Sequence, residues 1–265
     1  VITNGASPAL VLALATAFSP GDRIAFARPG YVAYRNTVRA LNFEGVEIAC
    51  GENTRYQLSA AALDALDPAP QGVIIASPAN PTGTIIPASE LAAIADVAKA
   101  KGIRIISDEI YHGLSFGPEI HSMLEYAPDA FIVNSFSKYF SMAPWRLGWL
   151  VSPPDMARRT GAYIGNLFLT APSLSQHAGL AAMDAREELD GHVEVYRRNR
   201  ELMLEALPKL GLEKIAPPDG AFYVYADVSR YTDDSLAFCL KLLEETGVAT
   251  APGVDFDPVD GKHFM

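Results

Sequence analysis

The chain has 265 residues, of which 49% are hydrophobic, with a net charge of −10 and a pI near 5.0. Nucleic-acid-binding proteins usually carry a basic patch, so this acidic balance argues against one and fits a metabolic enzyme of one large domain, alone or with a smaller one. No apolar stretch reaches the ~18 residues of a membrane span and no signal peptide is visible, so we expect a cytoplasmic protein that does not bind membranes.

Short apolar runs alternate with helical patterns along the chain, which is typical of an α/β protein with a mostly parallel sheet. Residues 1–3 are predicted to belong to a strand. Helices are predicted at residues 7–19, 59–66 and 88–102, where apolar residues recur at helical spacing and Ser, Pro or Gly flank the segment. The predicted strands lie at residues 23–27, 46–50, 72–77, 103–107, 131–135 and 148–152.

The last third of the chain has a different pattern. Residues 192–211 form a long amphipathic helix ending at Gly211, which we interpret as a bridge between two domains. Residues 220–229 alternate like a strand, and residues 233–247 form another amphipathic helix. We therefore predict a three-layer αβα large domain at residues 1–198 and part of a smaller α+β domain at residues 199–265.

Polar side chains follow three consecutive predicted strands, and ligands bind beyond the carboxyl ends of strands in parallel α/β sheets. Asn80 follows the strand at 72–77, and Asp108 and Tyr111 follow the next strand. Lys138 follows the strand after that, with Arg146 eight positions beyond it. One edge of the sheet therefore receives an amide, a carboxylate with a phenol, and an amine.

Each of these groups also has a structural explanation. Asn80 could belong to a turn, Asp108 could cap a helix, Tyr111 could lie in the core, and Lys138 could be solvated. These explanations do not predict four such groups at three strand ends, so we favour a shared functional site.

The chemistry that needs this set is that of pyridoxal 5'-phosphate (PLP). A lysine amine forms a Schiff base with the cofactor aldehyde, and a carboxylate keeps the pyridine nitrogen protonated so that the ring can accept electrons. The phosphate needs hydroxyls, an arginine and a helix N-terminus. Ala6 and Ser7, which open the first predicted helix, could supply that terminus.

Five segments, TNGASPAL, PGYVAY, SPANPTGT, SDEIYHGLSF and SFSKYFSMAPWRLGW, occur in this order. With them the chain resembles the class I/II aminotransferases, which are fold-type I PLP-dependent enzymes of the aspartate aminotransferase superfamily. The resemblance covers essentially the whole chain.

The resemblance implies a role for each matching residue. Lys138 would form the Schiff base and then move the α-proton of the substrate, and Asp108 would pair with the pyridine nitrogen. The catalytic residues would be Lys138, Asp108 and Tyr111. The other implied cofactor contacts are Asn80 with Tyr111 at the phenolate oxygen, Tyr31 on the ring face, and Ala6, Ser7, Ser135 and Arg146 at the phosphate.

The implied activity is transfer of an amino group from an amino acid to a 2-oxo acid, by a homodimer with small-molecule substrates. Family members extend further at both ends, and residues 252–265 resemble the segment that leads to an arginine for the substrate carboxylate. No arginine follows before Met265, so we expect a truncated chain, and the amino donor is not specified.

Two alternatives keep the fold but change the function. One is a PLP-dependent C–S or other β/γ-lyase. Related lyases tend to have histidine where this chain has Tyr111, which favours transamination. The other is a non-catalytic aminotransferase-like regulatory domain, against which the acidic balance argues.

The remaining residues add little. The two cysteines, Cys50 and Cys239, have no spacing typical of a disulfide framework or a metal site, so two buried free thiols are favoured. The five histidines have no metal-ligand spacing either, and we predict no metal. In residues 220–225, Phe222 or Tyr223 could face the substrate, although alternating core packing explains them equally well.

Overall fold

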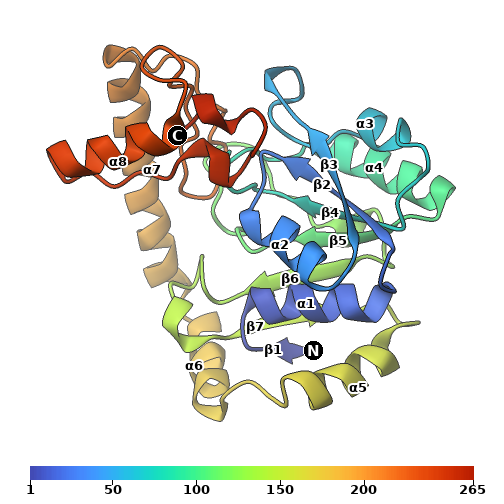
Figure 1. Cartoon of the computed structure of the whole chain (residues 1–265). Helices are drawn as coiled ribbons and strands as arrows, with labels where there is room; N and C mark the ends of the chain where they lie inside the picture. Colours follow the sequence, from blue (N-terminus) through green and yellow to red (C-terminus); the bar gives the residue numbers. More distant parts are fainter.

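The computed structural model describes all 265 residues and has a seven-stranded sheet as its centre. The five strands from β2 to β6 are mutually parallel, whereas β7 is antiparallel to β6, and β1 is antiparallel to β7 (Figure 1). Across the sheet the order is β1 (Ile2–Thr3), β7 (Gly148–Val151), β6 (Phe131–Ser135), β5 (Arg104–Asp108), β4 (Gly72–Ala76), β2 (Arg23–Arg28) and β3 (Glu44–Ala49).

The six predicted strands are all present, each within two residues of its expected bounds. Their continuous apolar runs are explained by burial on both faces of the sheet. In β4, Val73 and Ile75 point to one hydrophobic cluster, and Ile74 points to the other. Successive side chains of a strand alternate between faces, so one apolar run supplies both clusters.

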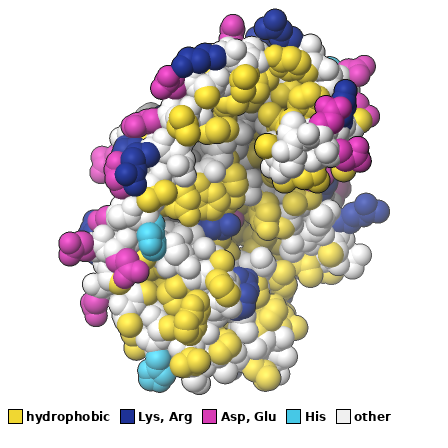
Figure 2. Space-filling view, turned by 90° about the vertical axis from the view of Figure 1, so that its left-hand side faces the viewer, with side chains coloured by type: hydrophobic (Ala, Val, Ile, Leu, Met, Phe, Trp, Pro, Cys, Tyr) yellow, Lys and Arg dark blue, Asp and Glu magenta, His cyan; other side chains and the backbone are white.

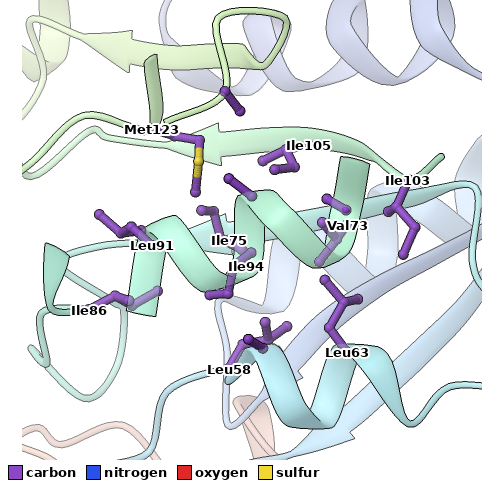
Figure 3. Close-up of a cluster of buried hydrophobic side chains, with 14 of the residues drawn as sticks. Leu58, Leu63, Val73, Ile75, Ile86, Leu91, Ile94, Ile103, Ile105 and Met123 are labelled. Atoms are coloured by element: carbon purple, nitrogen blue, oxygen red, sulfur yellow. The ribbon is translucent and has the colours of Figure 1, made fainter. Parts of the chain in front are cut away.

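Helices cover both faces and complete the three layers. The cluster drawn in Figure 3 packs α3 (Ala60–Asp64) and α4 (Ala88–Lys101) against one face. On the other face lie α1 (Ala6–Ala17), α2 (Val32–Ala40) and α5 (Ala157–Leu167). The predicted three-layer α/β architecture is therefore confirmed. The helices α2, α5 and α6 (Ser173–Met183) were not predicted from the sequence.

The bounds of α4 illustrate how local sequence defines these helices. Pro87 precedes the helix, Glu90 lies in its first turn, and Lys99 lies in its last turn. Charges of these signs at these ends favour the helix dipole. Gly102 ends the helix in the left-handed conformation that glycine adopts without a steric penalty.

The C-terminal part follows α7 (Arg186–Lys209), which runs along one side of the molecule and begins six residues earlier than predicted (Figure 1). It contains α8 (Ser235–Thr246) and two short 3₁₀ turns. The predicted division of the chain after residue 198 falls within α7 and remains a prediction.

The strand predicted at residues 220–229 is not formed as a continuous element, and this prediction was wrong. Its residues make only isolated bridges, Ser115 with Gly220, Ile215 with Ala226, and Asp227 with Phe264. The backbone groups of the segment are satisfied by several different neighbours rather than by one adjacent strand, so no ladder can form.

Two further observations concern the whole chain. Cys50 and Cys239 are both buried and unpaired, as predicted. None of the helices combines the length and the apolar character needed to cross a membrane.

Candidate active site

A cavity of about 190 Å³ lies beyond the carboxyl ends of the central strands. Strand pairing places Ala76 of β4 beside Asp108 of β5, and Asp108 beside Val133 of β6, so the loops after these strands start at one edge. Figure 2 shows a hollow near the middle of one face, with hydrophobic and basic side chains around it. The cavity is lined by Ala6, Ser7, Leu10, Tyr31, Ala33, Tyr34, Thr37, Asn80, Asp108, Ile110, Tyr111, Lys138 and Tyr223.

Asp108 is the last residue of β5, and its side chain is buried at the cavity. Its Oδ2 accepts a hydrogen bond from the Tyr34 hydroxyl at 2.6 Å, and its Oδ1 accepts one from the Ile110 N–H at 3.2 Å. Burial raises the pKa of Asp108, and the two hydrogen bonds and the nearby Lys138 oppose this rise. An ionised carboxylate at this position therefore favours a cationic partner in the cavity.

Lys138 lies in the turn after β6 and reaches the same cavity half-buried. Its Nζ is 5.5 Å from the ring centroid of Tyr111 and 5.4 Å from that of Phe222. Burial lowers the pKa of the amine, Asp108 opposes the change, and the charge of Arg146 adds to it. This environment favours the neutral amine more than water does.

Tyr111 and Asn80 bring a phenol and an amide to the cavity. Burial raises the pKa of Tyr111, and its hydroxyl lies 2.5 Å from the hydroxyl of Tyr223. The Oδ1 of Asn80 is buried without a hydrogen-bond partner. Buried polar atoms are normally paired, so this amide suits a ligand. Rotation about its last bond lets Asn80 offer an N–H donor or an acceptor there.

The N-terminus of α1 forms the other end of the cavity, where Ala6 and Ser7 lie. Gly5 precedes this helix with φ at +102°, and a Cβ on Gly5 would lie 2.5 Å from Nη2 of Arg146. The guanidinium also donates to the Ala143 carbonyl at 2.9 Å. A helix N-terminus beside an arginine is a favourable site for a phosphate.

The structure brings most of the predicted site residues together. Ser135 and Arg146 do not line the cavity: Ser135 is buried, its Oγ accepts the Ser137 N–H at 2.9 Å, and Arg146 lies beside Gly5. The proposed role of each residue remains a prediction. Those that line the cavity are Ala6, Ser7, Tyr31, Asn80, Asp108, Tyr111 and Lys138.

Tyr34 was missed by the sequence reasoning. It lies three residues after Tyr31 at the start of α2, and residues three apart share one face of a helix. Recognition of a helix that begins within PGYVAY, at Val32, would have placed both rings on one side of that helix. Tyr223 was considered, but no pattern in the sequence distinguishes it from a core tyrosine.

The residues of this cavity fit PLP. The N-terminus of α1, with Arg146 beside it at Gly5, suits the phosphate, and Asp108 suits a protonated pyridine nitrogen. Asn80 has a buried amide whose Oδ1 has no partner, and rotation of this amide would turn its NH2 donor toward a ligand oxygen. The amine of Lys138 faces the same space, as required for a bond to the aldehyde.

Comparisons with known proteins agree with this geometry. The family model "Aminotransferase class I and II" matches residues 1–258. Among curated proteins, the valine–pyruvate aminotransferase of Mycobacterium tuberculosis strain H37Rv is 50% identical over all of this chain and 69% of its own length.

Solved structures give the same result. A crystal structure of an aminotransferase from Mycobacterium tuberculosis matches with a TM-score of 0.98 and 50% identity, over all of this chain and 69% of that chain. An aspartate aminotransferase from Thermus thermophilus with maleate matches with a TM-score of 0.90 and 32% identity, over 97% of this chain and 68% of that one. The chain therefore belongs to the class I and II aminotransferase family, whose members depend on PLP.

Proposed function

We propose that Lys138 binds the cofactor aldehyde and moves the α-proton while an amino group passes from an amino acid to a 2-oxo acid. The observation that carries this proposal is that Lys138 and Asp108, from the ends of adjacent parallel strands, face one cavity. When bound, PLP supplies an aldehyde for amines and a ring that accepts the electrons released at the substrate Cα.

The surroundings of Lys138 suit both of its tasks. An amine must be neutral to attack an aldehyde or to accept a proton, and burial lowers the pKa of this one. Asp108 opposes the change, because a carboxylate stabilises the ammonium form. Pairing of Asp108 with the cofactor nitrogen would relieve that opposition.

Asp108 would hold the protonated ring nitrogen, and its partners prepare it for this. The Tyr34 hydroxyl bonds one carboxylate oxygen and the Ile110 N–H bonds the other, so the plane of the group is fixed. A hydrogen bond to a charged group contributes about 1.5–3 kcal/mol. Tyr31, which is held edge-to-face against Tyr34 at a centroid distance of 5.5 Å, would cover the ring.

For the substrates, we propose valine as an amino donor and pyruvate as an acceptor, on the strength of the 50% identical relative that is named for this pair. The test is a panel of amino donors with pyruvate and with 2-oxoglutarate. Faster transfer from aspartate than from valine would contradict this choice. Release of ammonia without an acceptor would indicate a lyase instead.

We also propose a cytoplasmic homodimer. Several large apolar side chains are exposed in residues 167–183, on and around α6, and burial of such a surface is a common basis for self-association. They are Leu167, Leu169, Leu174, Leu180 and Met183. Light scattering of the purified protein should give twice the chain mass, and a monomer at micromolar concentration would contradict the proposal.

The assignment of Lys138 is tested by reduction of the cofactor-loaded protein with borohydride, followed by peptide mass analysis. Cofactor should be trapped on the peptide that contains Lys138, and Lys138→Ala should abolish trapping. The matched control is Lys99→Ala, on α4 at the far end of the sheet from the cavity, which should trap cofactor normally. Trapping retained in Lys138→Ala would overturn the assignment.

A further inference from the structure

We propose that Tyr223 is a positioning residue that holds the Tyr111 hydroxyl at the cofactor and so links the C-terminal part of the chain to the chemistry. This inference rests on the proposed function, because Tyr111 matters only if the cavity binds the cofactor. Tyr223 comes from a segment more than 100 residues beyond Tyr111 in the chain.

The two tyrosines form a close pair at the cavity wall. Their hydroxyl oxygens are 2.5 Å apart, and their rings meet edge-to-face with centroids 5.6 Å apart. Tyr111 is 4% exposed, and no other side chain bonds its hydroxyl. A buried phenol normally has a hydrogen-bond partner, and here Tyr223 is that partner.

The backbone just before Tyr223 is hydrogen-bonded to two loops. These loops carry Asn80 and Tyr111, the residues proposed to hold the phenolate oxygen of the cofactor. The Gly220 N–H donates to the Gly83 carbonyl at 2.8 Å, in the turn that follows Asn80. The Ala221 N–H donates to the Leu114 carbonyl at 3.0 Å, in the loop that follows Tyr111. The segment therefore crosses between the two loops and is positioned by each of them.

An ion pair between the buried Asp219 and the half-exposed Arg55 holds the start of the same segment. Asp219 is 9% exposed, and its Oδ2 accepts hydrogen bonds from Arg55 at 2.6 Å and from the Ile85 N–H at 3.1 Å. These contacts join the C-terminal part to two earlier segments of the chain, one at Arg55 and one at Ile85. Tyr223 thus starts from a backbone that has little freedom to shift.

The conformation of Ala221 supports a positioning role. Ala221 is fully buried with φ at +58°, in the left-handed region that residues other than glycine rarely adopt. A strained residue of this kind persists only when the surrounding structure imposes it. Here the strain directs the chain so that Phe222 and Tyr223 turn toward Tyr111 and Lys138.

The pair can transmit an effect because a phenol has only one proton. If Tyr111 donates that proton to the phenolate oxygen of the cofactor, its own oxygen accepts the proton of Tyr223. Consecutive hydrogen bonds polarise one another, so Tyr223 would strengthen the bond from Tyr111 to the phenolate. A better stabilised phenolate lowers the pKa of the nitrogen that joins Lys138 to the cofactor.

The test follows the visible absorption of the cofactor-loaded protein as pH is varied, and takes the midpoint of the spectral change. Tyr111→Phe should raise the midpoint, because the phenolate loses its donor. Tyr223→Phe should raise it by about half a pH unit, which is a factor of ~3 in proton affinity. In the Tyr111→Phe background, Tyr223→Phe should produce no further shift.

Tyr225→Phe is the matched control, since Tyr225 lies two residues away and is buried against Phe264 rather than at the cavity. Its midpoint should equal that of the wild type. A Tyr223→Phe midpoint equal to the wild type, or a full shift that persists without Tyr111, would overturn the inference. Failure of the proposed function would look different, because borohydride would then trap no cofactor on Lys138 in any variant.

Discussion

Asp108 is a deeply buried carboxylate, and burying its charge lowers the free energy of unfolding. This effect can be measured without the cofactor. The residue is 7% exposed, and burial raises its pKa above the usual value of 3.8. The folded protein therefore binds this proton more tightly than the unfolded chain does. It follows that the free energy of unfolding falls as pH rises from about 4 through the pKa of the folded state.

We predict that Asp108→Asn stabilises the cofactor-free protein at pH 7 and weakens cofactor binding. The amide has no charge to bury, its oxygen can accept the Ile110 N–H, and its NH2 can donate to the Tyr34 hydroxyl, so unfolding should cost on the order of 1 kcal/mol more. Loss of a charge-assisted bond of about 2 kcal/mol should raise the dissociation constant of PLP roughly 30-fold. Urea unfolding between pH 4 and pH 7 and absorption titration measure the two effects.

Glu109→Gln is the matched control, because Glu109 is also buried and burial raises its pKa as well. Its carboxylate bonds Ser107, Ser122 and the Met123 N–H, away from the cavity. This variant should keep the cofactor affinity of the wild type. Equal affinity of Asp108→Asn and the wild type would contradict the pairing of Asp108 with the ring nitrogen.

Single residues differ in how well the sequence predicts them. Lys138, Asp108 and Asn80 were predicted at the site because each follows a short apolar run typical of a buried strand, and strand ends define the edge of a parallel sheet. Tyr34 and Tyr223 are linked to the site only through the side chains that they touch. These contacts join residues 74 and 112 positions apart, so no local pattern shows that Tyr34 bonds Asp108 or that Tyr223 bonds Tyr111.

At the scale of elements, the start of α1 depends on a single glycine. Gly5 has a φ of +102°, which a side chain rarely tolerates, and the guanidinium of Arg146 fills the space that a Cβ would need. Gly5 therefore lets the helix N-terminus and the arginine approach one another. Both are needed to concentrate positive potential at one end of the cavity.

We predict that Gly5→Ala costs about 2 kcal/mol in the free energy of unfolding and weakens PLP binding, because the backbone is strained and Arg146 is displaced. Gly161→Ala in α5 is the control, since a Cβ there meets nothing within 4 Å. In a helix interior, alanine is favoured over glycine by about 0.5–1 kcal/mol, so the control should be more stable. A Gly5→Ala protein with normal stability and affinity would contradict this role.

Elements were predicted where packing follows the local pattern. The strands and α4 have apolar runs and capping residues that agree with their burial, and their prediction was correct within two residues. The segment at 220–229 has a strand-like alternation, but no neighbour runs alongside it. Pairing partners come from tertiary structure, so alternation alone could not reveal that the ladder is missing.

At the scale of the whole molecule, the C-terminal part is attached to the sheet by contacts at the end of β2. Arg28 Nη1 bonds Asp257 Oδ1 at 2.7 Å and Asp260 Oδ2 at 3.0 Å, and the Gly30 N–H donates to the Phe256 carbonyl at 3.1 Å. The same stretch of chain continues to Tyr31 at the cavity. Attachment of the C-terminal part and placement of the cofactor ring are therefore structurally connected.

The two carboxylates on Arg28 allow a sharp test of this attachment. The Asp257 side chain is 6% exposed and also accepts the N–H groups of Val259 and Asp260, whereas the Asp260 side chain is 68% exposed. Removing one partner of a buried ion pair costs about 3–5 kcal/mol, and removing an exposed partner costs about 1 kcal/mol or less.

We predict that Asp257→Ala lowers the free energy of unfolding by about 3 kcal/mol and that Asp260→Ala lowers it by less than about 1 kcal/mol. Urea unfolding measures both, and limited proteolysis should cut the C-terminal part faster only in Asp257→Ala. Equal losses in the two variants would mean that burial of the ion pair does not hold the C-terminal part to the sheet.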